Sequence, residues 1–105
     1  MVGDLAVDTR SQTATRDGQA IRLTSREYAM LEFLARHAGE VVSRADITAH
    51  VWDENHDPFS NALEVYIGRL RRKIDSGARR PLIHTRRGSG YMLADLGEHA
   101  DDEER

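Results

Sequence analysis

The 105-residue chain contains no cysteine, which excludes disulfide bridges, thiolate zinc sites and cysteine nucleophiles. No apolar run approaches the roughly 18 residues that a membrane span needs. The first ten residues also lack the basic and apolar stretches of a signal peptide. We therefore expect a cytoplasmic protein with no membrane partner. A chain of this length predicts one domain, whose core is too small to enclose a substrate cavity on all sides.

Groups of side chains that would support catalysis or metal binding are also missing. Ser25, Ser43 and Glu27 are accounted for by helix starts, so no nucleophile with an adjacent base stands out. The dispersed histidines lack the close spacing of a structural zinc site: His37, His50, His56, His84 and His99. We expect neither an enzyme nor a metal or other cofactor.

Charge is distributed unevenly along the chain, although its net value is only −3. Residues 1–60 carry a net charge of −4 and residues 91–105 a net charge of −5, whereas residues 61–90 carry eight basic and two acidic side chains. Clustered positive charge, more than the average, marks a surface that binds nucleic acid. A basic face that contacts only solvent is the alternative interpretation. The acidic residues 96–105 show no apolar periodicity and are expected to form a disordered tail.

The N-terminal part of the chain predicts strands followed by a helix. Alternating apolar residues and the Asp17-Gly18 turn signal predict short antiparallel strands before Thr24. Thr24 and Glu27 fit the capping-box pattern that begins a first helix, and Gly39 is placed to end it as the residue directly after the cap.

The middle of the chain predicts a second helix and a loop. We expect the helix over residues 43–52, with Trp52 in the core, and a polar loop over residues 53–60. Val41-Val42, between the first two helices, is too short for more than an extended link.

A third helix, expected over about residues 61–75, is the most informative segment. Its apolar residues recur at spacings of 4, 3 and 4, which places them on one narrow stripe facing the core: Leu63, Ile67, Leu70 and Ile74. Gly68 lies on the opposite face, where glycine costs about 1 kcal/mol of helix propensity and permits close approach of another molecule.

The outer face of this helix has the chemistry of DNA base recognition. A B-DNA major groove accepts one α-helix, in which arginine pairs with guanine, asparagine with adenine and an aliphatic side chain with the thymine methyl. We expect base contacts from five side chains on or beside this face: Asn61, Val65, Tyr66, Arg69 and Arg72.

The last apolar segment, residues 82–94, predicts a β-hairpin with a glycine-rich turn and with Tyr91 in the core. Arg86 and Arg87 stand at the edge of the turn, where an arginine can enter an adjacent minor groove. Three side chains suit contacts with DNA phosphates, which position a protein without reading sequence: Arg71, Lys73 and Thr85.

Five separated motifs occur in a characteristic order: LTSREY with LEFL, VVSR, VW, NALEVYIGRLRRKI and TRRGSGY. Together they resemble the C-terminal effector domain of OmpR/PhoB-type two-component response regulators over about residues 3–95.

That resemblance implies an α+β winged helix-turn-helix with a four-stranded N-terminal antiparallel sheet, three helices and a C-terminal β-hairpin wing. It implies sequence-specific binding of double-stranded promoter DNA as a homodimer on tandem repeats, with Arg87 in the minor groove. Arg86 stands where a valine is common, which leaves open which of the two arginines enters. The chain would be the effector part of a longer regulator whose receiver domain is phosphorylated by a histidine kinase.

The loop that contacts RNA polymerase in that family matches the second predicted loop of this chain. Its expected contact residues are Asp53, Glu54, Asn55, His56 and Asp57. A winged-helix module that binds other proteins without DNA is the alternative. Affinity for duplex DNA that falls steeply with salt favours DNA binding, because each neutralised phosphate releases counterions.

Overall fold

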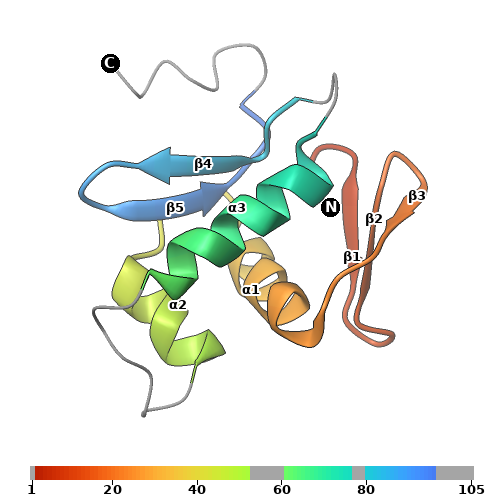
Figure 1. Ribbon diagram of the computed structural model, residues 1–105. Helices are drawn as coiled ribbons and strands as arrows, with labels where there is room; N and C mark the ends of the chain where they lie inside the picture. The colour runs from red at the N-terminus through yellow and green to blue at the C-terminus, as the bar shows by residue number, and fades with distance from the viewer. Residues whose placement is uncertain (1, 53–60, 77–79, 97–105) are drawn as a thin grey trace.

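The computed structural model describes residues 2–52, 61–76 and 80–96. The elements follow in the order β1 (Leu5–Asp8), β2 (Thr13–Arg16), β3 (Gln19–Ile21), α1 (Ser25–Arg36), α2 (Arg44–Val51), α3 (Ala62–Ile74), β4 (Ile83–Arg86) and β5 (Gly90–Leu93). This order confirms the expected winged helix-turn-helix. In Figure 1, α3 crosses in front of α1, and the β4–β5 hairpin and the N-terminal sheet lie to either side. No helix in the described part of the chain is long and apolar enough to cross a membrane.

The N-terminal sheet has three antiparallel strands in the order β1-β2-β3, so the expected fourth strand is wrong for the described residues. The chain turns at Gly3, which has a φ of +54°, and Val2 makes only an isolated bridge with Leu5. The predicted turn is confirmed, because Asp17 and Gly18 have φ values of 53° and 80° and join β2 to β3.

The capping box that begins α1 is confirmed. Thr24 Oγ1 accepts a hydrogen bond from the Glu27 N–H at 3.2 Å, and Glu27 Oε1 accepts one from the Thr24 N–H at 2.9 Å. The helix ends at Arg36 with His37 as its C-cap. Gly39, with a φ of +83°, lies two residues beyond that cap and not directly after it as predicted.

The core gathers side chains from all three helices and the hairpin. The predicted stripe of α3 is buried as expected: Leu63, Ile67, Leu70 and Ile74. It packs with Met30, Leu31 and Leu34 of α1, and Trp52 and Tyr91 are buried as predicted. One face of α3 is therefore fixed to the core.

The hairpin is anchored to the segment between α1 and α2. Val42 and Tyr91 form an antiparallel bridge, with N–H to carbonyl distances of 2.8 Å and 2.9 Å. Val42 is thus more than the extended link expected from the sequence. Gly90 makes the close approach possible, because a Cβ at this position would lie 1.9 Å from the Val42 carbonyl oxygen.

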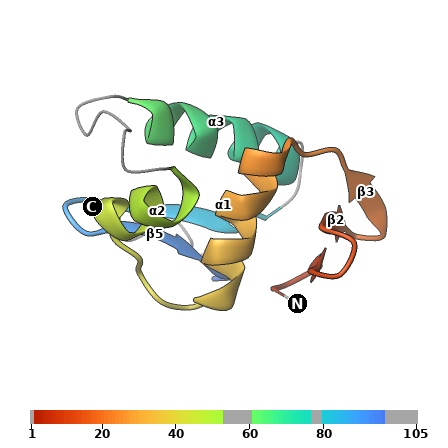
Figure 2. The same ribbon diagram turned by 90° about the horizontal axis from the view of Figure 1, so that it is seen from below.

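A buried guanidinium joins the N-terminal sheet to the end of α3. Arg16, on β2, is 2% exposed and donates to Asp4 Oδ1 at 2.7 Å, to the Ile74 carbonyl at 2.6 Å and to Asp75 Oδ1 at 3.1 Å. It also donates to the Arg80 carbonyl. We call these contacts the Arg16 network; they hold the sheet on the side of the molecule opposite the hairpin tip (Figure 2).

Candidate nucleic-acid interface

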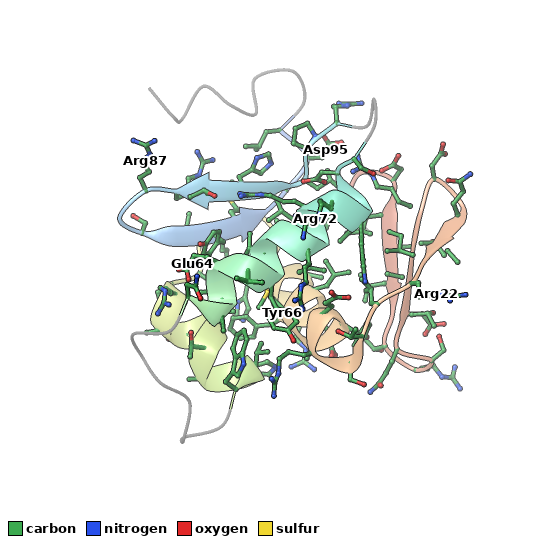
Figure 3. The ribbon with its side chains drawn as sticks, viewed as in Figure 1. Arg22, Glu64, Tyr66, Arg72, Arg87 and Asp95 are labelled. Carbon is green, nitrogen blue, oxygen red and sulfur yellow. The ribbon has the colours of Figure 1, made fainter. Side chains whose placement is uncertain are left out.

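The outer face of α3 is open to solvent. Val65 is 40% exposed, and Asn61, Arg69 and Arg72 are also exposed. Figure 3 shows Arg72 on the front of α3, on the side away from the hydrophobic core. Since the opposite stripe is buried, these four side chains form one rigidly mounted surface with a mixture of amide, aliphatic and guanidinium groups.

Asn61 and Gly68 are two notable positions on this surface. Asn61 is the N-cap of α3 and not its first helical residue, and its side chain makes no capping hydrogen bond. Gly68 lies one residue before Arg69 and four residues before Arg72, and a Cβ added there would meet no atom within 4 Å. The fold therefore does not require a glycine at this position.

Tyr66, predicted to contact a base, is half-buried and packs on the Trp52 ring. The two ring centroids lie 5.5 Å apart in an edge-to-face arrangement. Arg69 Cζ lies 4.9 Å from the Tyr66 centroid, and Arg26 Cζ lies 5.3 Å from the Trp52 ring. These four side chains form a continuous row, with a guanidinium at each end and two aromatic rings between them, that we call the aromatic ladder. The sequence analysis did not anticipate it.

Arg71 joins α3 to the hairpin. Its Nε donates to the Ile83 carbonyl at 3.2 Å, and its Nη2 donates to Thr85 Oγ1. Arg71 and Thr85 were both predicted to contact phosphates. In the structure they hold the wing against the helix, although the Thr85 hydroxyl keeps its own proton to donate elsewhere.

Lys73, the third predicted phosphate contact, is paired within the fold. Its Nζ lies 2.6 Å from Glu27 Oε1, and the Glu27 side chain is 2% exposed. Burial by itself raises the pKa of Glu27, but hydrogen bonds from Lys73 and Thr24 outweigh it and hold the pKa below its ordinary value of 4.5. The ion pair ties the end of α3 to the start of α1.

Arg44, for which the sequence analysis found no role, joins α2 to α3. It makes two hydrogen bonds with the Glu64 carboxylate, at 2.7 Å and 3.3 Å. The hydrogen bond from Arg44 lowers the pKa of Glu64, against a smaller opposing effect of partial burial. Glu64 is the one acidic residue in residues 61–74, and a lone acid in a basic segment was the available signal for such a partner.

The tip of the hairpin carries Arg87, which is exposed, next to the half-buried Arg86. Figure 3 shows Arg87 at the tip, and both ribbon views show the tip reaching past the N-terminal end of α3. A groove of about 440 Å³ separates the wing from the start of α2, and its lining includes Arg44, Arg86 and Arg87. The arginines of the wing therefore face Arg44 at the start of α2 across this groove.

The predicted polymerase-contact residues lie outside the described residues. Within the described residues, no group of three His, Asp or Glu side chains is placed to hold a metal ion.

Comparison with known sequences identifies the family. Residues 18–93 match the family described as "Transcriptional regulatory protein, C terminal". The chain is 51% identical over 92 residues to the transcriptional regulatory protein CusR of Escherichia coli, a match that covers 88% of this chain and 40% of CusR. It is 44% identical over 93 residues to the probable transcriptional regulatory protein TcrX of Mycobacterium tuberculosis, covering 89% of this chain and 39% of TcrX. The chain thus spans about 40% of the length of these relatives.

Solved structures agree with the sequence comparison. The DNA binding domain of CpxR from E. coli superposes with a TM-score of 0.79 at 36% identity, covering 92% of this chain and 96% of that chain. The RstA DNA-binding domain of Klebsiella pneumoniae, solved in complex with the RstA box, gives a TM-score of 0.79 at 29% identity, with coverages of 90% and 95%. DrrB, a Thermotoga maritima OmpR/PhoB homolog, gives 0.75 at 36% identity, with coverages of 88% and 42%. The chain therefore belongs to the transcriptional regulatory protein family defined by this C-terminal domain, as its resemblance to OmpR/PhoB-type effector domains predicted.

Proposed function

We propose that this chain binds double-stranded DNA sequence-specifically, with α3 in the major groove and the wing in the adjacent minor groove. The observation that carries the proposal is the outer face of α3, where exposed guanidiniums stand on a helix whose other face is locked in the core. The RstA domain, of the same fold, was solved on its DNA site, which supports this assignment.

Each exposed side chain has a role that follows from its chemistry. Arg69 and Arg72 are assigned to guanine edges, Asn61 to an adenine edge and Val65 to a thymine methyl. Arg87 is assigned to the minor groove in preference to Arg86, because it is the more exposed of the two. Arg71 and Thr85 hold the wing on α3, and Lys73 holds α3 on α1. The Thr85 hydroxyl retains a donor for a phosphate.

We also propose that the chain acts as the cytoplasmic effector domain of a two-component response regulator. Its span of about 40% of its relatives leaves room for a receiver domain in the whole protein, phosphorylated by a histidine kinase. Two copies would bind tandem repeats in promoter DNA. Asp53, Glu54, Asn55, His56 and Asp57 would then contact RNA polymerase.

A selection experiment tests DNA binding and identifies the operator motif in the same step. The 105-residue chain selects duplexes from a randomised pool of about 30 base pairs, long enough for two half-sites one helical turn apart. We expect one enriched motif, and an affinity whose logarithm falls with log salt by about 0.9 per neutralised phosphate.

Two variants then locate the interface. Arg69→Ala should weaken binding to the selected duplex by about 5- to 100-fold and relax the preference at one position. Arg87→Ala should weaken binding and relax the preference at the flanking position. Arg10→Ala, in the exposed turn between β1 and β2, is the matched control. No enriched motif together with a flat salt profile would favour a protein-binding module. Wild-type affinity in both variants would exclude the proposed docking.

A further inference from the structure

The aromatic ladder gives Tyr66 a role other than touching DNA. We infer that Tyr66 is a positioning residue, whose ring holds the Arg69 guanidinium in the orientation that reads a base. This inference rests on the proposed function, because it presumes that Arg69 contacts DNA. It replaces the expectation that Tyr66 itself contacts a base.

The geometry of the ladder supports a platform role. Tyr66 and Arg69 are three residues apart on α3, so their side chains are neighbours on the helix surface. The guanidinium carbon stands 4.9 Å from the ring centroid, within the range at which a cation is attracted to an aromatic face. Arg69 is therefore in contact with the ring before any DNA arrives.

The Tyr66 ring is itself held in place by a second aromatic side chain. Trp52 is buried in the core and contacts the Tyr66 ring edge-to-face at 5.5 Å. Arg26 of α1 lies over the Trp52 ring from another element. The orientation of Tyr66 is thus determined by α1, by the end of α2 and by α3 together.

An arginine ordered in this way binds DNA at a lower entropic cost. A long side chain in solvent samples many rotamers, and it loses that freedom when it pairs with a base. Where the free protein has already restricted the side chain, that part of the cost is not incurred on binding. The N–H donors of the Arg69 guanidinium are also held in a defined position, which favours one base over its alternatives.

A double-mutant cycle separates this role from direct contact. Tyr66→Phe and Tyr66→Leu are made alone and together with Arg69→Ala, and affinities are measured for the duplex selected from the randomised pool. We expect Tyr66→Phe to stay within about 2-fold of wild type, because the ring is kept, and Tyr66→Leu to lose about 3- to 10-fold. In the Arg69→Ala background, Tyr66→Leu should cost less than about 2-fold.

Two measurements exclude a merely structural effect. Phe33→Leu is a matched control, because it removes a half-buried aromatic ring of α1 outside the ladder. It should lower stability, and its effect on affinity should be the same with and without Arg69→Ala. In the free protein, the side-chain protons of Arg69 should show a ring-current NMR shift. The shift should persist in Tyr66→Phe and disappear in Tyr66→Leu.

The outcomes discriminate between the two proposals. If Tyr66→Phe loses as much affinity as Tyr66→Leu, the hydroxyl contacts DNA and the positioning role is wrong. If Tyr66→Leu is neutral, or costs the same with and without Arg69, the ring does not act through Arg69 and the inference fails. If Arg69→Ala itself leaves binding unchanged, the proposed placement of α3 fails.

Discussion

Gly68 is the one position on the outer face of α3 without a side chain, and the protein fold gives no reason for it. The space around a Cβ at this position is open to 4 Å, and glycine weakens the helix. The interpretation that another molecule approaches this point closely stays a prediction.

Gly68→Ala should separate stability from binding. We expect the substitution to raise the free energy of unfolding by about 1 kcal/mol, because alanine favours the helix. Affinity for the selected duplex should fall, because the added methyl occupies space needed by the DNA. Urea unfolding and a binding titration measure the two effects. Ala49→Gly, on the exposed face of α2, is the control for helix propensity alone; unchanged affinity in Gly68→Ala would remove the close-approach interpretation.

Glu27 makes stability depend on pH. Its pKa is held below 4.5 in the folded protein, so the unfolded chain binds more protons in that range. Stability from this carboxylate is therefore complete above the unfolded pKa and is lost as the pH falls through the folded one. Urea midpoints measured from about pH 7 down to about pH 3 should decrease in the acid range.

Glu27→Gln keeps an oxygen acceptor for the Thr24 N–H but removes the charge beside Lys73. We expect this variant to be less stable than wild type near neutral pH and to show a flatter acid profile. Glu40→Gln, at an exposed position, serves as the control. An acid profile identical to wild type in Glu27→Gln would show that this ion pair does not carry the effect.

At the scale of elements, the wing is held against the α1–α2 connection where Gly90 and Tyr91 approach Val42. Gly90→Ala would place a Cβ 1.9 Å from the Val42 carbonyl oxygen, at a φ of +140°. We expect a loss of about 2–3 kcal/mol of stability and faster hydrogen exchange at the Val42 and Tyr91 amides. Gly88 also has a positive φ but has nothing within 4 Å. Gly88→Ala should cost only about 1 kcal/mol, and equal losses in both variants would contradict the clash.

Elements whose signals are local were predicted correctly from the sequence. The capping box at Thr24, the turn at Asp17-Gly18 and the buried stripe of α3 each depend on residues within one or two turns of chain. The described residues form three N-terminal strands, not the four that the family resemblance implied. The Val42–Tyr91 bridge was missed, because it joins segments far apart in the chain.

In the candidate site, too, local features were predicted from the sequence and contacts between elements were not. Helical periodicity correctly predicted the exposed face that carries Arg69 and Arg72. It did not show that Arg71 and Lys73 are paired within the fold, because their partners lie on other elements. Charge and spacing identify candidate cations, but only the tertiary structure shows which ones are already paired.

At the scale of the whole molecule, the Arg16 network connects regions that lie far apart in the sequence. It links the N-terminal sheet to the last turn of α3 and to the segment leading into the hairpin. Asp75 also accepts hydrogen bonds from the Leu82 and Ile83 amides, so the sheet, the helix and the wing share one polar junction. Arg16 follows Ala14 on the inward face of β2, which was the available signal for a buried role.

Arg16→Met should be among the most destabilising single substitutions in the chain. It fills similar space but leaves the Asp75 carboxylate without its cationic partner, and we expect a loss of about 3 kcal/mol or more. Arg22→Met, at an exposed position that follows the same sheet, should change stability by less than about 0.5 kcal/mol. Thermal and urea unfolding measure both, and similar stabilities for the two variants would contradict a structural role for the network.

Two of the acceptors used by Arg16 are main-chain carbonyls, at Ile74 and Arg80. Every amino acid carries such an oxygen, so the side chain at position 80 is open to replacement while position 16 needs a long group with several donors. In a library of functional variants, many different residues should therefore be found at position 80, and almost none other than arginine at position 16.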